Sequence, residues 1–138
     1  VSYEAEAAIY LEMLAVRDST PDFIPPVYKE SGGLITCDPS VIIQELLALS
    51  GRRDGSYLAR LFHNSVIEAM AGIAERASSA AKTGNVLLAG GVYQNRLILA
   101  GMEKRLASAG LNVFFNKKLP ANDAGISAGQ AVFGVYNA

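Results

Sequence analysis

Tryptophan is absent from this 138-residue chain, and cysteine and histidine occur once each, as Cys37 and His63. One cysteine excludes an internal disulfide, and together with one distant histidine it cannot build a zinc site. No apolar run is long enough to cross a bilayer, and no basic stripe accompanies the net charge of −1. We therefore expect neither a membrane nor a nucleic acid as partner, and a reducing, cytoplasmic setting.

Hydrophobic residues make up 51% of the chain, which is high for a soluble domain of this size. Two explanations stay open: apolar surface packs against a missing part of the protein, or the chain is an alanine-rich helical protein. A helix-like pattern begins at Val1 itself. We therefore expect no signal peptide, and we expect residues 1–138 to be one domain, cut out of a longer protein.

The first two thirds of the chain carry helical patterns and one hairpin pattern. Ser2 is a suitable N-cap, prolines exclude helix from position 21, and Ser31-Gly32-Gly33 separates two short apolar runs. Asp38-Pro39 is typical of a helix start. The expected elements are a helix over 2–16, strands over 23–28 and 34–37, and helices over 38–49 and 56–81, the last with an inward stripe of Leu58, Phe62, Val66, Met70, Ile73 and Ala77.

The last third alternates between strand and helix. Val86–Ala89 is a short apolar run, typical of a strand buried on both faces. A helix over 93–109 with Ile98, Met102, Leu106 and Ala109 inward, a strand over 111–115 and a helix over 123–136 follow. This order predicts two parallel strands joined by a crossover helix, and therefore an α/β fold.

Two loops, 90–93 and 116–122, follow the carboxyl ends of these strands, and ligands of open α/β sheets bind along that edge. Gly90-Gly91 lets a ligand approach the backbone, and the helix behind it offers free N–H groups to an anion. Asn95 can hydrogen-bond a sugar hydroxyl or a base edge. The alternative is a glycine turn that only lets strand and helix pack.

Other polar residues admit plainer interpretations. Asp123 opens the last helix, where it is either an N-cap or one ligand of a metal such as Mg²⁺. Glu12 is interpreted as a solvated charge. His63 is either a histidine without a special task or a ligand, and the two adjacent lysines at 117 and 118 serve solubility. The sequence contains no P-loop, Rossmann glycine fingerprint or nucleophile elbow.

Four segments, spread over nearly the whole chain, resemble motifs of one known family. Residues 88–96 read LAGGVYQNR, residues 119–130 read LPANDAGISAGQ, residues 60–64 read RLFHN and residues 3–8 read YEAEAA. They resemble SGGVFQNR, PPNDGGISLGQ, RFHN and YEGQAA of the HypF family of hydrogenase-maturation carbamoyltransferases. The first two motifs are specific, whereas the shorter two carry little weight alone.

The resemblance implies ATP-dependent transfer of a carbamoyl group from carbamoyl phosphate, through a carbamoyl-adenylate, to the carboxyl-terminal cysteine of a hydrogenase-maturation partner. That group is later dehydrated to the cyanide ligand of nickel–iron hydrogenase. The implied fold is one lobe of an actin-like ATPase, ribonuclease-H-like domain, with a short hairpin, a parallel βαβα unit and several helices. Antibiotic O-carbamoyltransferases and tRNA threonylcarbamoyl transferases are related to this family.

The resemblance also implies roles for single residues. It assigns nucleotide binding to Gly90, Gly91 and Asn95, a ribose contact to Glu12 and a divalent metal (Mg²⁺, Fe or Zn) to Asp123. The family's HHxAH motif is not in this sequence, so the other metal ligands must come from the missing N-terminal portion of the same protein. Its acylphosphatase-like, zinc-finger and adenylate-forming domains are likewise not part of it.

The sequence departs from the family at Ala5 and Ala124, where the motifs have glycine. Because half of the nucleotide cleft is missing, we expect weak or absent activity from this chain alone. One alternative is a non-catalytic assembly module, whose apolar face forms a homodimer or docks to the missing lobe. Another is a lobe of a different actin-like enzyme, such as a tRNA threonylcarbamoyl transferase or a sugar kinase. The runs QN and NDAGISAGQ favour the carbamoyltransferase.

Overall fold

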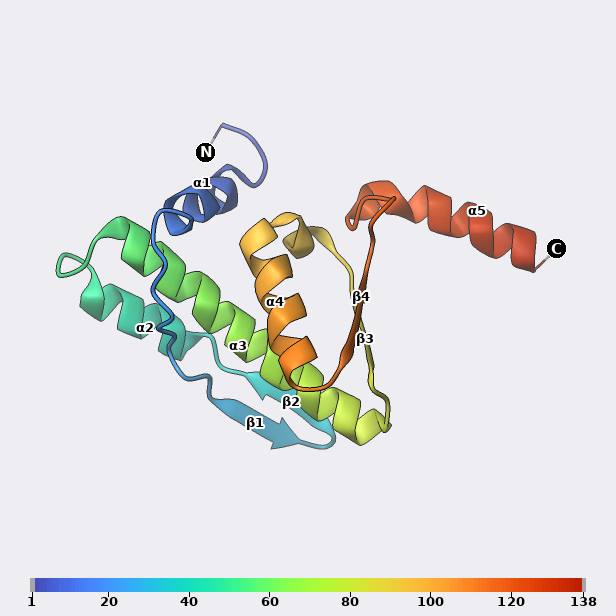
Figure 1. Cartoon of the computed structure of the whole chain (residues 1–138), viewed down its shortest axis with the longest axis horizontal. Coiled ribbons are helices and arrows are strands. Elements are labelled where there is room, and N and C mark those ends of the chain that lie inside the picture. Colours follow the sequence, from blue (N-terminus) through green and yellow to red (C-terminus); the bar gives the residue numbers. More distant parts are fainter. Residues whose placement is uncertain (1, 138) are drawn as a thin grey trace.

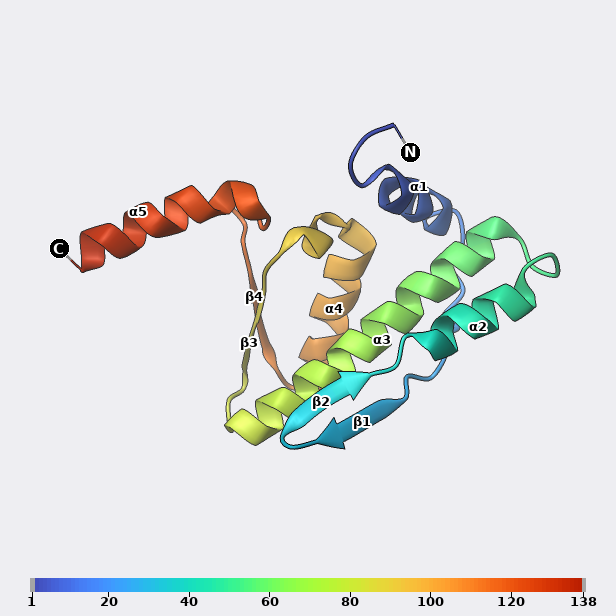
Figure 2. The same cartoon turned by 180° about the vertical axis from the view of Figure 1, so that it is seen from behind.

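The computed structural model describes residues 2–137, and one long central helix organises it (Figure 1). In chain order the elements are α1 (Glu6–Ala15), β1 (Tyr28–Ser31), β2 (Leu34–Cys37), α2 (Ser40–Leu49), α3 (Gly55–Ala81), β3 (Asn85–Leu88), η1 (Gly91–Gln94), α4 (Arg96–Ser108), β4 (Asn112–Phe115), η2 (Asp123–Gly125) and α5 (Ile126–Tyr136). Helices α1, α2 and α4 and strand β2 all contact α3. Helix α5 projects away from this body in both views (Figures 1 and 2).

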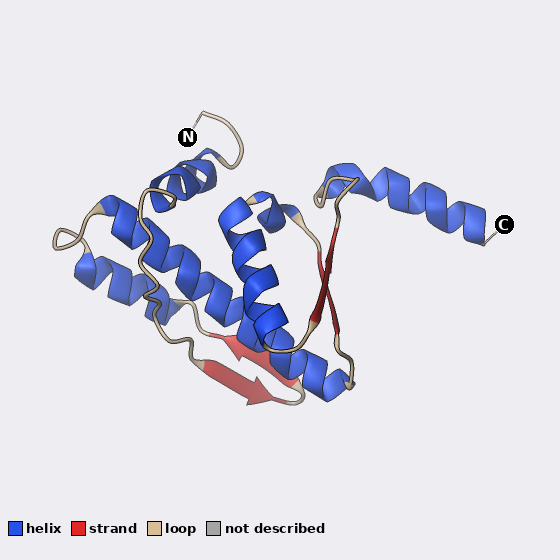
Figure 3. Ribbon diagram, in the orientation of Figure 1, coloured by secondary structure: helices blue, strands red, loops and turns tan. Residues whose placement is uncertain are grey.

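Two separate two-stranded sheets accompany the helices (Figure 3). Strands β1 and β2 are antiparallel, and the intervening Gly32 and Gly33 have φ of +57° and +79°, which glycine adopts without steric cost. Strands β3 and β4 are parallel, with Val86 opposite Val113, and η1 and α4 connect them. The predicted α/β class, with a short hairpin and a parallel βαβα unit, is therefore confirmed.

The larger core lies between α3, α4 and the parallel pair. Its buried members are Ile67, Ala71, Leu88, Ile98, Met102 and Leu106. The prediction for α4 was right at the last three of these and wrong at Ala109, which is exposed beyond the helix end. The stripe predicted for α3 was wrong: its members are half-buried, or exposed in the case of Ala77. Because elements pack on several sides of α3, its buried residues follow more than one stripe.

One face of the parallel pair is open. Leu87 and Phe114, which are directly opposite in the register, are 68% and 53% exposed, so the prediction of a strand buried on both faces was wrong. Helix α5 has no buried residue, and its Phe133 and Tyr136 are 70% and 85% exposed. We call these four residues the outer face, and exposed apolar side chains of this kind fit a surface that contacts a partner. Within residues 2–137, no helix has the length and apolarity needed to span a bilayer.

The helix starts follow local capping chemistry. Asp38 accepts a hydrogen bond from the Ser40 N–H at 3.0 Å, as expected, although α2 begins at Ser40. Asp54 accepts from the Ser56 N–H at 2.8 Å, and this hydrogen bond holds the pKa of Asp54 below its ordinary value. The prediction that Ser2 caps the first helix was wrong. Helix α1 begins at Glu6, after Ala5, whose φ of 63° lies in the left-handed region.

The conformation of Ala5 gives a physical reason for the glycine that the family motif has at this position. A left-handed alanine costs roughly 1–2 kcal/mol, which exceeds the extra entropy that glycine loses on folding. We expect Ala5→Gly to raise the free energy of unfolding by about 0.5–1 kcal/mol in urea denaturation. The control is Ala8→Gly within α1, which should lower that free energy by about 0.5–1 kcal/mol. If both substitutions change the free energy of unfolding in the same direction, this account is wrong.

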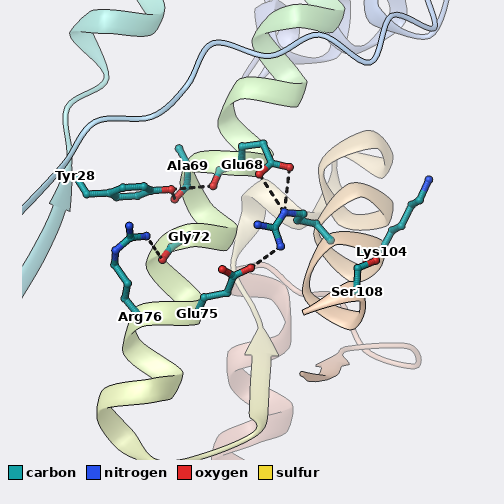
Figure 4. A network of polar contacts seen from close by, with 9 residues as sticks. Tyr28, Glu68, Ala69, Gly72, Glu75, Arg76, Lys104 and Ser108 are labelled. Atoms are coloured by element: carbon teal, nitrogen blue, oxygen red, sulfur yellow. Dashed lines mark hydrogen bonds and ion pairs between the residues drawn. The ribbon is translucent and has the colours of Figure 1, made fainter. Parts of the chain in front are cut away.

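A polar network holds the hairpin and α4 against α3 (Figure 4). The Arg105 guanidinium on α4 pairs with Glu68 at 3.0 Å and with Glu75, both on α3. The hydrogen bond to Glu68 is the main cause that raises the pKa of Arg105. From β1, the Tyr28 hydroxyl donates to the Glu68 carbonyl oxygen at 3.0 Å, and burial raises the pKa of this tyrosine. The network fixes α4, and with it the turn before α4, relative to α3.

Candidate functional site

The two loops after β3 and β4 meet at one rim. Gly90 has φ 107° and ψ 163°, a conformation that L residues rarely adopt. Its N–H donates to the Ala121 carbonyl oxygen at 2.8 Å, which joins the Gly90-Gly91 turn to the loop that leads to Asp123. A Cβ placed on Gly91 would have Asn122 Cβ as its nearest neighbour, at 4.0 Å. The predicted meeting of the loops is therefore present, with open space over Gly91.

The start of α4 differs from the prediction. A 3₁₀ turn, η1, begins at Gly91, and α4 begins three residues later than expected, at Arg96. Asn95 is its N-cap: Asn95 Oδ1 accepts from the Ile98 N–H at 3.0 Å. We expected the first N–H groups of this helix to be free for an anion. That expectation was wrong for the Ile98 and Arg96 N–H groups, because each has a hydrogen-bond partner within the chain.

The partner of the Arg96 N–H is Glu12, which reaches across from α1. Glu12 Oε1 accepts the Arg96 N–H at 2.9 Å, over a separation of 84 residues. A carboxylate is well placed there, because the first turn of a helix carries partial positive charge. The second oxygen of Glu12 has no hydrogen-bond partner in the described part of the chain. Glu12 and Asn95 therefore meet at the beginning of α4, beside the glycine turn.

Asp123 lies in η2 and is exposed. The cap of this turn is Asn122, whose Oδ1 accepts from the Ala124 N–H at 3.2 Å. Asp123 therefore does not serve as the N-cap, and among residues 2–137 its carboxylate has no hydrogen-bond or ion-pair partner. The same residues contain no group of three or more histidine, cysteine, aspartate or glutamate side chains placed to hold a metal. Within the described residues, Asp123 can therefore contribute one carboxylate to a metal site but cannot form the site alone.

A match to a known family identifies the kind of protein that contains this rim. Residues 1–130 match the family described as "Carbamoyltransferase, Kae1-like Domain, second subdomain" of HypF. The chain belongs to the HypF carbamoyltransferase family. The carbamoyltransferases HypF of Rhizobium leguminosarum bv. viciae and Rhodobacter capsulatus are 34% and 37% identical to it over 131 residues. The chain covers 16% of the length of each, and 95% of the chain is matched.

A solved structure supports the same assignment. A full-length HypF in the phosphate- and nucleotide-bound form superposes with a TM-score of 0.89 at 30% sequence identity. The match covers 97% of this chain and 18% of that one. The HypF fold predicted from the sequence motifs is thus shared over nearly all of the residues described here.

Two residues of the HypF motifs have structural roles that sequence reasoning did not find. Gly125 follows Asp123 and Ala124, and a Cβ on it would lie 2.5 Å from the Pro120 carbonyl oxygen, so the loop closes tightly only with glycine. His63 is 2% exposed, and its Nε2 lies 2.9 Å from Asn95 Nδ2. In the sequence, only the place of His63 in the motif RLFHN drew attention to it, and nothing indicated which residue it contacts.

Two further side chains, Tyr93 and Lys117, lie in the elements next to the rim and make simpler contacts. Tyr93 in η1 packs against the larger core, and burial raises its pKa, so its phenol stays neutral at physiological pH. Lys117 Nζ lies 5.2 Å from the centre of the Phe115 ring, within the range of a cation–π contact. No hydrogen bond joins either side chain to the glycine turn, so Glu12, Asn95 and Asp123 stay the candidate ligand-binding residues of the HypF rim.

Proposed function

We propose that this chain is part of a cytoplasmic, ATP-dependent carbamoyltransferase. The proposed reaction moves a carbamoyl group from carbamoyl phosphate, via carbamoyl-adenylate, to the carboxyl-terminal cysteine of a hydrogenase-maturation protein. The supporting observation is the 2.8 Å hydrogen bond from Gly90 to Ala121, which puts an open glycine turn and an unpartnered Asp123 carboxylate on one rim. Family membership supports carbamoyl transfer as the chemistry.

The proposed nucleotide binding depends on the space and the unused hydrogen-bonding atoms at the rim. No atom lies closer than 4.0 Å to the position that a Cβ on Gly91 would take, so a ligand has room against the backbone. Asn95 uses one donor and one acceptor within the chain and keeps one of each. Glu12 keeps one free carboxylate oxygen, an acceptor suited to a ribose hydroxyl. In this proposal the three residues orient ATP as a substrate rather than react with it.

The metal role rests on Asp123. Its unpartnered, exposed carboxylate is the donor type that Mg²⁺ prefers, and Fe and Zn also accept carboxylate ligands. A bound metal would supply charge neutralisation at phosphate oxygens. The other ligands come from the remainder of the protein in this proposal, because residues 2–137 offer no group of three. The chain alone is therefore proposed to be inactive, and micromolar ATP–Mg²⁺ binding to it in calorimetry would contradict that.

Asp123→Asn tests the proposal in the full-length polypeptide. Removing the negative charge removes a metal ligand while keeping the shape of the side chain, so we expect carbamoyl transfer to fall at least about 100-fold, which is close to 3 kcal/mol in the barrier. The melting temperature should stay the same, because the carboxylate has no partner within residues 2–137. The assay follows carbamoylation of an acceptor peptide that ends in cysteine.

The matched control is Glu45→Gln, which removes an exposed charge from α2. It should leave the rate within about twofold of wild type, as surface substitutions usually do. If Asp123→Asn transfers carbamoyl groups as fast as this control, Asp123 is not a ligand and the metal part of the proposal fails.

A second function, non-catalytic assembly, is favoured by the outer face. Leu87, Phe114, Phe133 and Tyr136 are all more than half exposed, on β3, β4 and α5. An apolar surface of this kind mediates association with the missing lobe or with a second copy of the chain. Light scattering tests it: a concentration-dependent dimer supports the assembly role, and a monomer at all concentrations contradicts homodimerisation.

A further inference from the structure

A directed chain of hydrogen bonds runs from α3 to the start of α4. His63 Nδ1 lies 2.7 Å from the Ala59 carbonyl oxygen, and His63 Nε2 lies 2.9 Å from Asn95 Nδ2. Asn95 Oδ1 in turn accepts from the Ile98 N–H at 3.0 Å. A carbonyl oxygen can only accept and a backbone N–H can only donate, so both ends of the chain are fixed.

The two fixed ends of this hydrogen-bond chain determine which atoms of His63 and Asn95 donate and which accept. In the neutral ring, His63 carries its proton on Nδ1, which donates to the Ala59 carbonyl oxygen, and Nε2 is then an acceptor. Asn95 must then donate with Nδ2 and accept with Oδ1, and a flipped amide would oppose like groups at both contacts. His63 therefore selects one orientation of the Asn95 amide. Because His63 is 2% exposed and its ring packs edge-on to Phe62 at 5.6 Å, it cannot easily move.

This orientation matters because Asn95 stands at the rim. One N–H and one lone pair of its amide remain uncommitted, and Asn95 is only half-buried. The residue also links η1 to α4, so its anchor on α3 fixes the end of the Gly90-Gly91 turn.

We infer that His63 is a positioning residue: it anchors Asn95 so that one amide N–H faces an oxygen acceptor of the nucleotide. The inference rests on the proposed function for its ligand, an adenine nucleotide. It predicts that removing the acceptor on His63 weakens nucleotide binding in a protein that is still folded.

The test compares three variants in the full-length polypeptide. His63→Leu removes the acceptor, whereas His63→Gln keeps an oxygen that can accept from Asn95. Ser65→Ala is the matched control, because Ser65 is another fully buried polar residue of α3, bonded to the Ile24 N–H at 2.8 Å and away from the rim. All three are expected to lose some stability.

Two measurements are made on each variant: ATP–Mg²⁺ affinity by calorimetry, and amide hydrogen exchange of the segment 90–98. We expect His63→Leu to lose at least about tenfold in affinity and to exchange faster in this segment, with His63→Gln within about threefold of wild type. Ser65→Ala should keep wild-type affinity and exchange there.

The outcomes separate the two ideas. Wild-type exchange in His63→Leu, or affinity that falls equally in His63→Leu and Ser65→Ala, overturns the positioning role. If the wild-type protein binds no nucleotide while His63→Leu still exchanges faster at 90–98, the proposed function fails and the anchoring of Asn95 stands.

Discussion

Gly91→Ala is expected to abolish most nucleotide binding while leaving the fold intact. A Cβ on Gly91 meets no atom closer than 4.0 Å, and this glycine lacks the positive φ of its neighbour, so alanine fits the unliganded chain. A ligand lying against the backbone would lose that space. A clash worth about 2 kcal/mol lowers the ATP affinity of the full-length polypeptide about 30-fold. Calorimetry gives the affinity, and thermal unfolding checks the fold.

Two further glycines sharpen this test. Gly90→Ala should lower stability itself, by about 1–3 kcal/mol, because φ is 107° there. Gly84→Ala lies in open space before β3, away from the rim, and should change neither quantity. If Gly91→Ala binds ATP like wild type, the two glycines are only a packing turn, the alternative that the sequence left open.

Gly72→Ala should lower the stability of the protein by steric overlap. Gly72 is buried on α3 under the Tyr28 ring of β1, and its Cβ would lie 2.6 Å from Tyr28 Cζ and even closer to the hydroxyl. The tyrosine cannot swing away freely, because its hydroxyl donates to α3 and Arg76 lies 3.9 Å above its ring. Overpacking and the lost hydrogen bond outweigh the better helix propensity of alanine, so we expect a net loss of about 2 kcal/mol in urea denaturation.

The control for this prediction is Gly134→Ala on α5, where a Cβ meets nothing within 4 Å. It should not destabilise the protein. A double variant that adds Tyr28→Ala removes the obstructing ring, so the cost of Gly72→Ala should largely vanish in that background. If the cost is the same with and without Tyr28, the steric account of Gly72 is wrong.

Local sequence patterns predicted the elements near the site because their causes are local. The Gly32-Gly33 hairpin turn and most of the apolar period of α4 depend on neighbouring residues, and both are present. The Asp38-Pro39 start was close, with α2 beginning at Ser40 and Pro39 as its N-cap. The parallel pairing of β3 and β4 followed from chain order and general topology. These features were enough to bring the glycine turn and the Asp123 loop to one rim.

The features that were missed depend on residues far apart in the sequence. Nothing near Glu12 indicates that it caps a helix 84 residues away, and nothing near His63 indicates Asn95. The exposure of Leu87 depends on which elements cover the sheet. The pattern of apolar residues along a strand does not predict that covering. Alanine rarely adopts the left-handed conformation that Ala5 has at the start of α1. Local residue preferences therefore favoured Ser2 as the N-cap, and that prediction was wrong.

The bond between Glu12 and Arg96 has a consequence for how the molecule is made. Synthesis from the amino terminus, at about 5–20 residues per second, delivers Arg96 roughly 4–17 s after Glu12. Until then α1 can contact α3, but the Glu12 carboxylate has no α4 N–H from which to accept. The hydrogen bond between Glu12 and the start of α4 therefore cannot form before the last third of the chain has been synthesised. A ligand that contacts Glu12 and Asn95 together would recognise only molecules that have completed this step.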